Sequence, residues 1–420
     1  MRGIIENKKE AIIFFLAAFG LSIRINFIGS ISLTEIFVLT QIPVLWKWIK
    51  KFQFPEFNKF CYLFAMLIAS QILISFLQNA TGQDTLKSIM LSLETLLITL
   101  FFAKKLIYTP QLIILIPIAN ILSLIIIGDQ FGFANDGETT YFKFYVAPMI
   151  ANIACIVILQ TKYKWFTNKS AFVFIFAGFF CIIGGARSMG FSLLFTAIVC
   201  LVVKSNIKLS IKKIWPQIII FAVIFQLFYA TVYIPKVQSG EWGSNQNREQ
   251  LEKINYSKNI FMMLLAARSD FFVSWMAFTD KPLLGHGYMA KDYTHKYAMA
   301  QAALLKTNYV TKEDIKLVPA HSVLLGYGVY HGILSLLLFS IIFYYVYKLG
   351  IKSLRFNHNY RAYLSYILII SAQHILFGPP AVLKNYNAIL WAVILMFYFR
   401  TKRYEIQINS RNCNLSKESG

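Results

Sequence analysis

The chain has 420 residues, 57% of them hydrophobic, and a mean hydropathy of +0.57. Soluble proteins are nearer half apolar, and an uncharged run such as residues 106–128 can cross about 30 Å of hydrocarbon, so an ordinary soluble domain is excluded. The net charge of +22 could indicate a nucleic-acid-binding protein, but the basic residues sit in short patches between apolar runs, and this excludes that class.

Long apolar stretches without polar alternation follow one another along the chain, which predicts helices rather than a membrane β-barrel. The seventh and eighth stretches are short and adjacent, which predicts a tight helical hairpin. The fold class expected is an all-α integral membrane protein with about 12 transmembrane helices, at residues 11–29, 31–46, 60–77, 88–103, 108–128, 144–160, 171–186, 188–203, 214–233, 319–346, 362–378 and 385–399.

The basic residues predict the orientation of these spans. Of the 41 Lys and Arg residues, 25 fall in the termini and alternate short connectors, and only 5 fall in the short connectors between them. Cytoplasmic connectors are the ones enriched in Lys and Arg, so both termini are expected in the cytoplasm. The chain then divides into transmembrane helices 1–9 (residues 1–233), a long periplasmic loop (234–318), helices 10–12 (319–400) and a cytoplasmic tail (401–420).

The long loop is expected to fold back as a cap over the membrane-embedded part. A helical segment is predicted at about residues 257–280, because Ile260, Leu264, Phe271 and Trp275 recur at helical spacing. Such a helix can lie in the membrane interface. The five cysteines are absent from this loop and have no metal-ligand spacing, so we expect free apolar thiols, no metal and no cofactor.

Arg187 lies in the sequence Gly-Gly-Ala-Arg-Ser-Met-Gly between two short apolar runs. A charge this close to hydrocarbon is costly, and its guanidinium matches phosphate oxygens, so an anion clamp with help from Ser188 is one interpretation. The other is an arginine at the membrane boundary whose charge reaches water from a tight turn.

Two further motifs lie in and after the long loop. Arg268 and Trp275 are seven residues apart on one predicted helix face, and Pro282 ends that helix before a turn with Gly285, His286, Gly287 and Tyr288. The alternative is a surface helix with an ordinary glycine loop. His321 and Ser322 lie where the loop re-enters the membrane, and His321 is either a general base or a hydrogen-bonded interfacial residue. Glu35 and Glu94 lie inside predicted spans, where they either pair with Arg24 or other polar groups or mark a proton path.

The order of these pieces resembles the bacterial O-antigen ligase and polymerase superfamily. The resemblance rests on an outward hairpin with Arg187, a long loop with Arg268, Trp275 and Pro-Leu-Leu-Gly-His-Gly-Tyr, and then Ala-His-Ser entering a helix. It covers about residues 170–345. The family usually has Asn after the histidine, where this chain has Ser322, and that weakens the ligase interpretation.

The resemblance implies a glycosyltransferase of the bacterial inner membrane that is metal-independent and works at the periplasmic face. Its donor would be a glycan on undecaprenyl pyrophosphate, with Arg187 and Arg268 holding the pyrophosphate and His321 acting as base or positioning group. Substrate contacts are expected from Ser188, Trp275, Gly285, His286, Tyr288 and Ser322. The function expected is an O-antigen or capsular polysaccharide polymerase, with membrane lipids and a chain-length regulator as partners and no nucleic acid. The alternatives are an O-antigen ligase acting on lipid A core and a flippase for the lipid-linked glycan.

Overall fold

The computed structural model describes most of the chain, and 83% of the described residues are helical. The described residues are 8–26, 30–52, 54–128, 141–160, 166–202, 219, 223, 226–242, 248, 251–252, 256–259, 269–305, 317–354 and 360–418. The single sheet among them is a hairpin of two short antiparallel strands, β1 (Arg24–Asn26) and β2 (Ser30–Ser32). The expectation of an all-α protein is therefore confirmed.

The helical elements succeed one another with short connections in the first half of the chain. They are α2 (Lys8–Gly20), α3 (Leu33–Thr40), α4 (Ile42–Phe52), α5 (Pro55–Leu77), α6 (Gly82–Tyr108), η1 (Pro110–Ile114), α7 (Leu115–Ile126), η3 (Phe142–Val146), α9 (Ala147–Gln160), α10 (Phe166–Ile183), α11 (Arg187–Val202), η4 (Tyr229–Tyr233), α13 (Ile234–Gln238), α16 (Ser269–Asp280), α17 (Lys296–Leu305), α18 (Val323–Leu354), α19 (Arg361–Phe377), η6 (Leu383–Asn387) and α20 (Ala388–Glu418).

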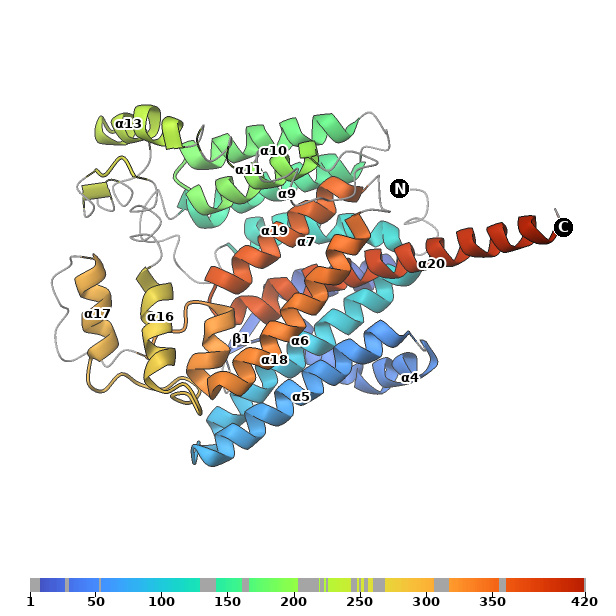
Figure 1. Ribbon diagram of the computed structural model, residues 1–420, viewed down its shortest axis with the longest axis horizontal. Coiled ribbons are helices and arrows are strands. Elements are labelled where there is room, and N and C mark those ends of the chain that lie inside the picture. The colour runs from blue at the N-terminus through green and yellow to red at the C-terminus, as the bar shows by residue number, and fades with distance from the viewer. Residues whose placement is uncertain are drawn as a thin grey trace.

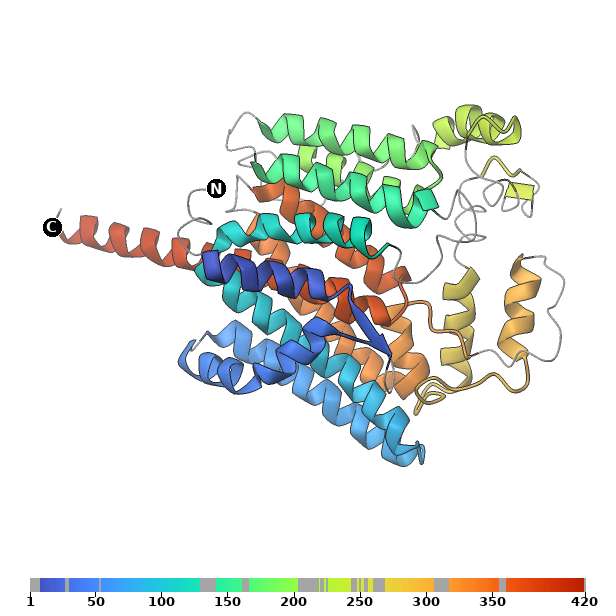
Figure 2. The same cartoon turned by 180° about the vertical axis from the view of Figure 1, so that it is seen from behind.

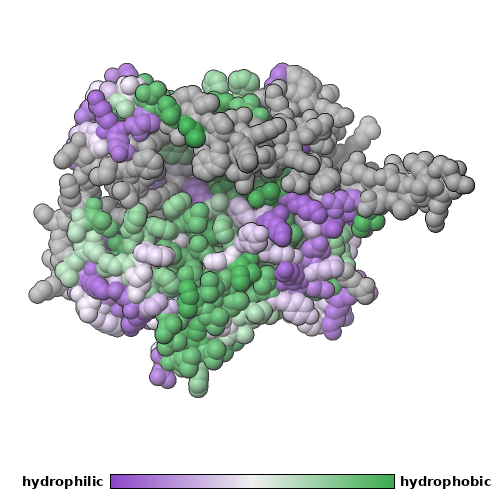
Figure 3. Space-filling model, in the orientation of Figure 1, coloured by the Kyte–Doolittle hydropathy of each residue, from purple (hydrophilic) through white to green (hydrophobic). Residues whose placement is uncertain are grey.

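Several of these helices could cross a membrane. Within the described residues, α5, α6, α18 and the continuous helix Phe142–Gln160 are long and apolar enough to do so. Shorter apolar helices, α10, α11 and α19 among them, accompany these four. The protein therefore has the character of a membrane protein, and in Figure 3 apolar side chains gather in the middle of the visible face while polar ones gather toward its two ends.

The first 52 residues differ from the two spans expected there. The helix α2 ends at Gly20, and the hairpin β1–β2 follows before α3 and α4. A capping box explains the restart at α3, because Ser32 and Glu35 each accept a hydrogen bond from the other's backbone N–H. The run 11–29 is therefore not one continuous helix, because α2 is followed by the strand β1.

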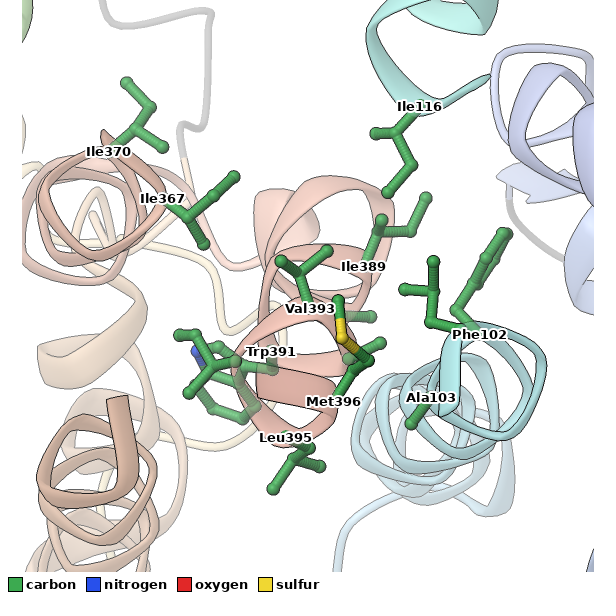
Figure 4. Packing of buried hydrophobic residues seen from close by; sticks show 14 of the residues in the cluster. Phe102, Ala103, Ile116, Ile367, Ile370, Ile389, Trp391, Val393, Leu395 and Met396 are labelled. Carbon is green, nitrogen blue, oxygen red and sulfur yellow. The ribbon is translucent and has the colours of Figure 1, made fainter. Parts of the chain in front are cut away.

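The long helices run side by side, and the first part of α20 lies among them, while its second part projects from the bundle toward the C-terminus (Figures 1 and 2). It packs against α6, α18 and α19. Trp391, Val393 and Leu395 of α20 are completely buried among side chains of α6, α7 and α19 (Figure 4). A helix segment that is buried on every side, as this one is, lies in the middle of a helix bundle.

Residues from segments that the sequence predicts to be cytoplasmic meet at one end of the bundle. Lys105 at the end of α6 pairs with Glu10 of α2, and Lys352 of α18 lies 3.5 Å from Glu405 of α20. At the same end Trp48 donates a hydrogen bond to the Tyr108 hydroxyl. The helices of the long loop, α13, α16 and α17, lie at the opposite end (Figure 1), which is called the loop end below.

The long loop packs onto α18 as the expected cap. Val273, Ala277 and Phe278 of α16 form an apolar cluster with Val329 and Tyr330 of α18. The loop also closes on itself, because the Val318 N–H donates to the Ala290 carbonyl at 2.8 Å. Residues 257–259 are not helical, so the helix predicted at about 257–280 does not include its first three residues; the part described as helix, α16, ends at Asp280 as predicted. Arg268, Ile260 and Leu264 fall outside the described residues.

Helix α18 is broken near its start, at His331 and Gly332. Gly332 has a φ of +68° and a ψ of −168°, a conformation that is open to glycine almost alone. The break frees backbone groups inside the bundle, and such groups must find other partners. Residues 282–288, called the docking segment below, supply them.

The docking segment completes the hydrogen bonding of the broken helix. The Ile333 N–H donates to the Pro282 carbonyl at 2.7 Å, and the His286 N–H donates to the Val329 carbonyl at 2.7 Å. The Gly287 N–H donates to the Tyr330 carbonyl at 3.1 Å. Gln78 at the end of α5 joins both sides, because its Nε2 donates to the carbonyls of Leu284 and Tyr330 at 2.5 and 3.0 Å.

Candidate functional site

The turn between α10 and α11 presents Arg187 at the first position of α11. Gly185 adopts a φ of +93°, and the Ala186 N–H donates to the Cys181 carbonyl at 2.8 Å, which closes the turn. The two helices then pack closely, because a side chain at Gly190 would overlap the carbonyl of Gly178. The tight hairpin predicted here is confirmed.

The Arg187 side chain is half-buried at this turn, and its charge lies within electrostatic range of Tyr233 of η4. Tyr229 lies within electrostatic range of the same guanidinium. The backbone N–H groups at the start of α11 and the guanidinium together concentrate positive potential at one point of the loop end. This arrangement, with two tyrosine side chains beside the guanidinium, suits a phosphate oxygen.

The Ser188 hydroxyl is hydrogen-bonded to a side chain of α19. Gln373 donates from Nε2 to the Ser188 hydroxyl and accepts at Oε1 from the Ser192 hydroxyl. The amide therefore bridges two turns of α11 and fixes its first turn against the end of α19. A substrate contact by Ser188 stays a prediction.

His321 lies just before α18 and faces α16. Its Nε2 is 3.9 Å from a carboxylate oxygen of Asp270, and its backbone N–H donates to the Ser274 hydroxyl at 3.2 Å. The side chain is 57% exposed, so it can reach a bound substrate. A carboxylate next to an accessible imidazole is the arrangement that orients a general base.

Ser322 is completely buried at the start of α18. Its hydroxyl accepts a hydrogen bond from the Leu325 N–H at 3.2 Å and donates to the Ile375 carbonyl at 3.4 Å. Ser322 thus caps α18, a task that Asn performs equally well. The buried serine therefore fixes the start of α18.

The end of α19 holds the Arg187 turn and the His321 turn in one framework. Gln373 contacts Ser188, and Ile375, two residues further on, contacts Ser322. The turns that carry Arg187 and His321, two of the three predicted motifs, are therefore both held by the end of α19. The third predicted group, Arg268, lies outside the described residues.

Trp275 is half-exposed on α16, where its ring centroid lies 5.8 Å from that of Phe278. The face of α16 buried against α18 is that of Val273 and Ala277, two positions away from the face that the spacing of Phe271 and Trp275 predicts. Trp275 and the exposed Phe272 remain available to a substrate or to the membrane interface.

Gly285, His286 and Tyr288 belong to the docking segment. Gly285 has a φ of +77°, and a side chain there would come within 2.7 Å of the Val329 carbonyl, so glycine is needed for close approach to α18. His286 Nε2 contacts the Ala277 carbonyl at 2.8 Å and the Tyr297 hydroxyl at 3.1 Å. Gly285 and His286 thus hold the long loop against its neighbours. The ring of Tyr288 lies 5.1 Å from the ring of Tyr330, measured between centroids.

Acid should loosen the docking segment. Burial lowers the pKa of His286 below its ordinary value near 6.5, against the opposing effect of the hydrogen bond to Ala277. The unfolded segment therefore binds more protons, and stability is lost as the pH falls below about 6.5. We expect hydrogen exchange of residues 282–297 to be faster at pH 5.5 than at pH 7.5 after correction for the intrinsic rate.

Titration of the neighbouring Asp280 carboxylate does not account for the loss of stability below about pH 6.5. Hydrogen bonds from Lys296, at 2.5 Å, and from Tyr297, at 2.8 Å, lower the pKa of Asp280, so its contribution is lost only in stronger acid. His286→Gln, which keeps a donor for Ala277, is the matched control. Equal protection at both pH values in the wild type, or an equal loss in His286→Gln, would contradict the role of His286.

A buried ionic cluster lies at the same end. Lys384 Nζ is 3.1 Å from Glu35 and 2.8 Å from Glu94, and the two carboxylate side chains are 1% and 3% exposed. The partner of the glutamates predicted from the sequence was Arg24 or a polar neighbour, and the structure provides Lys384. Buried charges require such pairing.

A small cavity of about 10 Å³, room for one water molecule, lies beside the break in α18. Tyr288 of the docking segment, Gln71 of α5, Ser88 of α6 and Tyr330 and His331 of α18 help to line it. Sequence reasoning missed Gln71, Ser88 and His331. The available signal was the recurrence of Ser88, Ser92, Glu94 and Thr95 in an apolar span, which indicates a polar interior face.

Comparison with known proteins does not assign the chain to a family. No family model matches its sequence, and no curated protein matches it.

Proposed function

We propose that the protein is a polysaccharide polymerase of an O-antigen or capsule pathway. It would join undecaprenyl-pyrophosphate-linked repeat units at the periplasmic face of the bacterial inner membrane. The observation that carries the proposal is the placement of Arg187 at the start of α11 and of His321, beside Asp270 of α16, just before α18, with both turns held by the same end of α19.

The chemistry fits this placement. Transfer of a glycan from a pyrophosphate requires stabilisation of the departing negative charge, and fixed cations and helix N-termini in a water-poor site supply it. The acceptor hydroxyl must lose a proton, and the accessible imidazole of His321 beside Asp270 can take it. Arg187 and Arg268 would hold the pyrophosphate, and His321 would serve the acceptor.

Twelve spans with both termini in the cytoplasm form part of the proposal. The contacts of Lys105 with Glu10 and of Lys352 with Glu405 support it, because all four residues come from segments predicted to be cytoplasmic. Arg187, His321 and Lys384 come from segments predicted to be periplasmic, and they lie toward the loop end. The basic segments and the long loop thus occupy opposite ends of one bundle.

One observation favours a different class, a transporter of the lipid-linked glycan. Glu35, Lys384 and Glu94 form a buried ionic cluster, and ionisable groups inside membrane bundles often mark ion paths. Loss of a flippase would leave lipid-linked repeat units facing the cytoplasm. Loss of a polymerase would leave them facing the periplasm, where an external glycosidase can reach them in spheroplasts.

The test is the surface glycan profile of a strain without this gene, resolved on a gel. Lipid A core that carries a single repeat unit is expected for a polymerase and should return to a ladder when the wild-type gene is restored. Bare core with accumulated lipid-linked polymer would instead identify the ligase. An unchanged lipopolysaccharide ladder with unchanged capsule would reject both glycosyltransferase assignments.

A further inference from the structure

The tip of the docking segment presents apolar side chains outward. Leu283 is 74% exposed and Leu284 is 40% exposed, and Pro282 before them is exposed as well. Gly285, which follows, is buried against α18. Three consecutive exposed apolar residues in a loop indicate a surface that contacts something other than water.

The tip lies between α5 and α18. Gln78 at the end of α5 donates to the Leu284 carbonyl at 2.5 Å, and the Ile333 N–H of α18 donates to the Pro282 carbonyl at 2.7 Å. Exposed apolar residues of both helices lie beside these contacts and form one surface with the tip, called the tip patch below: Phe76, Leu77, Leu283, Leu284, Leu334 and Leu337. In Figure 3, apolar surface covers the part of the visible face where α5 and α18 lie in Figure 1. Both helices are long and apolar enough to cross a membrane, so the tip continues a surface that suits lipid.

The lengths of the two helices place the tip at an edge of the hydrocarbon layer. Gly332 and Lys352 of α18 are 20 residues apart, and Lys59 and Gln78 of α5 are 19 apart. At about 1.5 Å per residue each pair spans about 30 Å, which is the thickness of the layer. Lys352 lies 3.5 Å from Glu405 at the end of the bundle opposite the loop end. With both lysines at that edge, Gln78 and Gly332 lie at the other edge, and the tip lies with them.

The backbone of the tip suits this position. Irregular backbone at membrane depth is tolerated where the protein supplies its hydrogen-bond partners. The carbonyls of Pro282 and Leu284 are bonded as described above, and Pro282 has no N–H that would need a partner. The Gly285 N–H donates to the Lys281 carbonyl at 2.9 Å. The Lys281 side chain is exposed directly before the tip, where an ammonium group can reach lipid phosphates.

We infer that the tip of the docking segment binds the lipid bilayer, with Leu283 and Leu284 in contact with phospholipid acyl chains at the edge of the hydrocarbon layer on the side of the loop end. A part of the long loop is thus anchored in the membrane, and this anchor holds α16 and His321 beside the membrane surface. The inference requires α5 and α18 to span the membrane, and it is independent of the proposed glycosyl transfer.

The first experiment identifies what touches the tip. The full chain is placed in nanodiscs of phosphatidylethanolamine and phosphatidylglycerol, with a photoreactive benzophenone amino acid at one position at a time. At position 283, illumination should produce a covalent adduct with the mass of the protein plus one phospholipid. Phe76, which is 79% exposed on α5, is the positive control. Glu241, whose exposed side chain pairs with Lys236 of α13, is the negative control and should give no lipid adduct.

The second experiment changes the polarity of the tip. Leu283→Asp places a carboxylate at the edge of the hydrocarbon, which is costly, so the thermal unfolding midpoint in nanodiscs should fall by several degrees. The same change to a side chain exposed to water would have little effect. Leu283→Phe keeps the apolar character and should keep the midpoint. Tyr293→Asp, at a residue that is 69% exposed elsewhere in the long loop, is the matched control and should also leave the midpoint unchanged.

The outcomes separate lipid from other occupants of the tip patch. A lipid adduct at Phe76 without one at position 283 would overturn the inference, as would a crosslink from position 283 to a second copy of the chain. An unchanged midpoint in Leu283→Asp, or an equal fall in Tyr293→Asp, would also contradict it. Lipid adducts at position 283 in a protein that transfers no glycan would retain the membrane anchor and reject the polymerase.

Discussion

Arg187→Ala should abolish chain elongation while the protein stays in the membrane at its normal level. Removal of one fixed donor to a developing oxyanion costs enzymes roughly 10²–10³ in rate, and Arg187 would in addition bind a full pyrophosphate charge. Arg187→Lys should restore only part of the rate, because an ammonium ion lacks the planar fork that matches two phosphate oxygens. The measurements are the surface glycan ladder and the rate of transfer by purified protein, each normalised to protein amount.

A matched control comes from the same end of the molecule. Lys236→Ala removes an exposed cation of α13 that pairs only with Glu241 among its described contacts, and it should leave the ladder intact. Arg268→Ala is expected to behave as Arg187→Ala does. Normal ladders from either arginine variant would remove that residue from the pyrophosphate clamp.

Gly332→Ala should destabilise the protein by more than about 3 kcal/mol. The glycine has a φ of +68° and a ψ of −168°, which is costly for any other residue, and a Cβ there would overlap the Leu283 carbonyl of the docking segment. The helix cannot straighten to relieve the overlap without giving up the bond between Ile333 and Pro282. Thermal unfolding in detergent should show a midpoint several degrees lower.

Gly82→Ala is the comparison for this effect. Gly82 opens α6, and a side chain there would meet no atom within 4 Å, so its replacement should change the midpoint little. Faster hydrogen exchange in residues 282–288 of Gly332→Ala would tie the loss to the docking segment. A midpoint equal to that of the wild type would show that α18 does not need its break.

Helices and turns that depend on one continuous segment could be predicted from the sequence. The apolar runs predicted α5, α6, α9 and α18 with ends a few residues off, and two short runs around Arg187 predicted the α10–α11 hairpin. Pro282 correctly marked the end of α16, and Gly285 and Gly287 correctly marked a turn. Each of these depends on a local preference or a continuous stretch of apolar residues.

Contacts between distant segments could not be read in this way. Lys384 meets Glu94 across 290 positions of the chain, and Ser88 meets His331 across 243. The sequence alone suggests no partner for His331, because that partner lies on another helix. The hairpin β1–β2 was missed for a different reason: Ile23, Ile25 and Ile31 continue the apolar character of the first run, while the polar residues between them change its period.

The break in α18 also has a consequence for how the chain is made. Gln78 and residues 282–288, which bond to the exposed backbone of the break, both precede α18 in the sequence. The ribosome therefore completes both partners before the interrupted helix leaves the exit tunnel. A membrane helix with unpaired backbone groups inserts poorly. Because Gln78 and residues 282–288 are already synthesised when α18 emerges, the unpaired backbone groups of the break can form their hydrogen bonds at once. A circular permutation that moved α18 ahead of the loop would remove that advantage without changing a single contact in the finished protein.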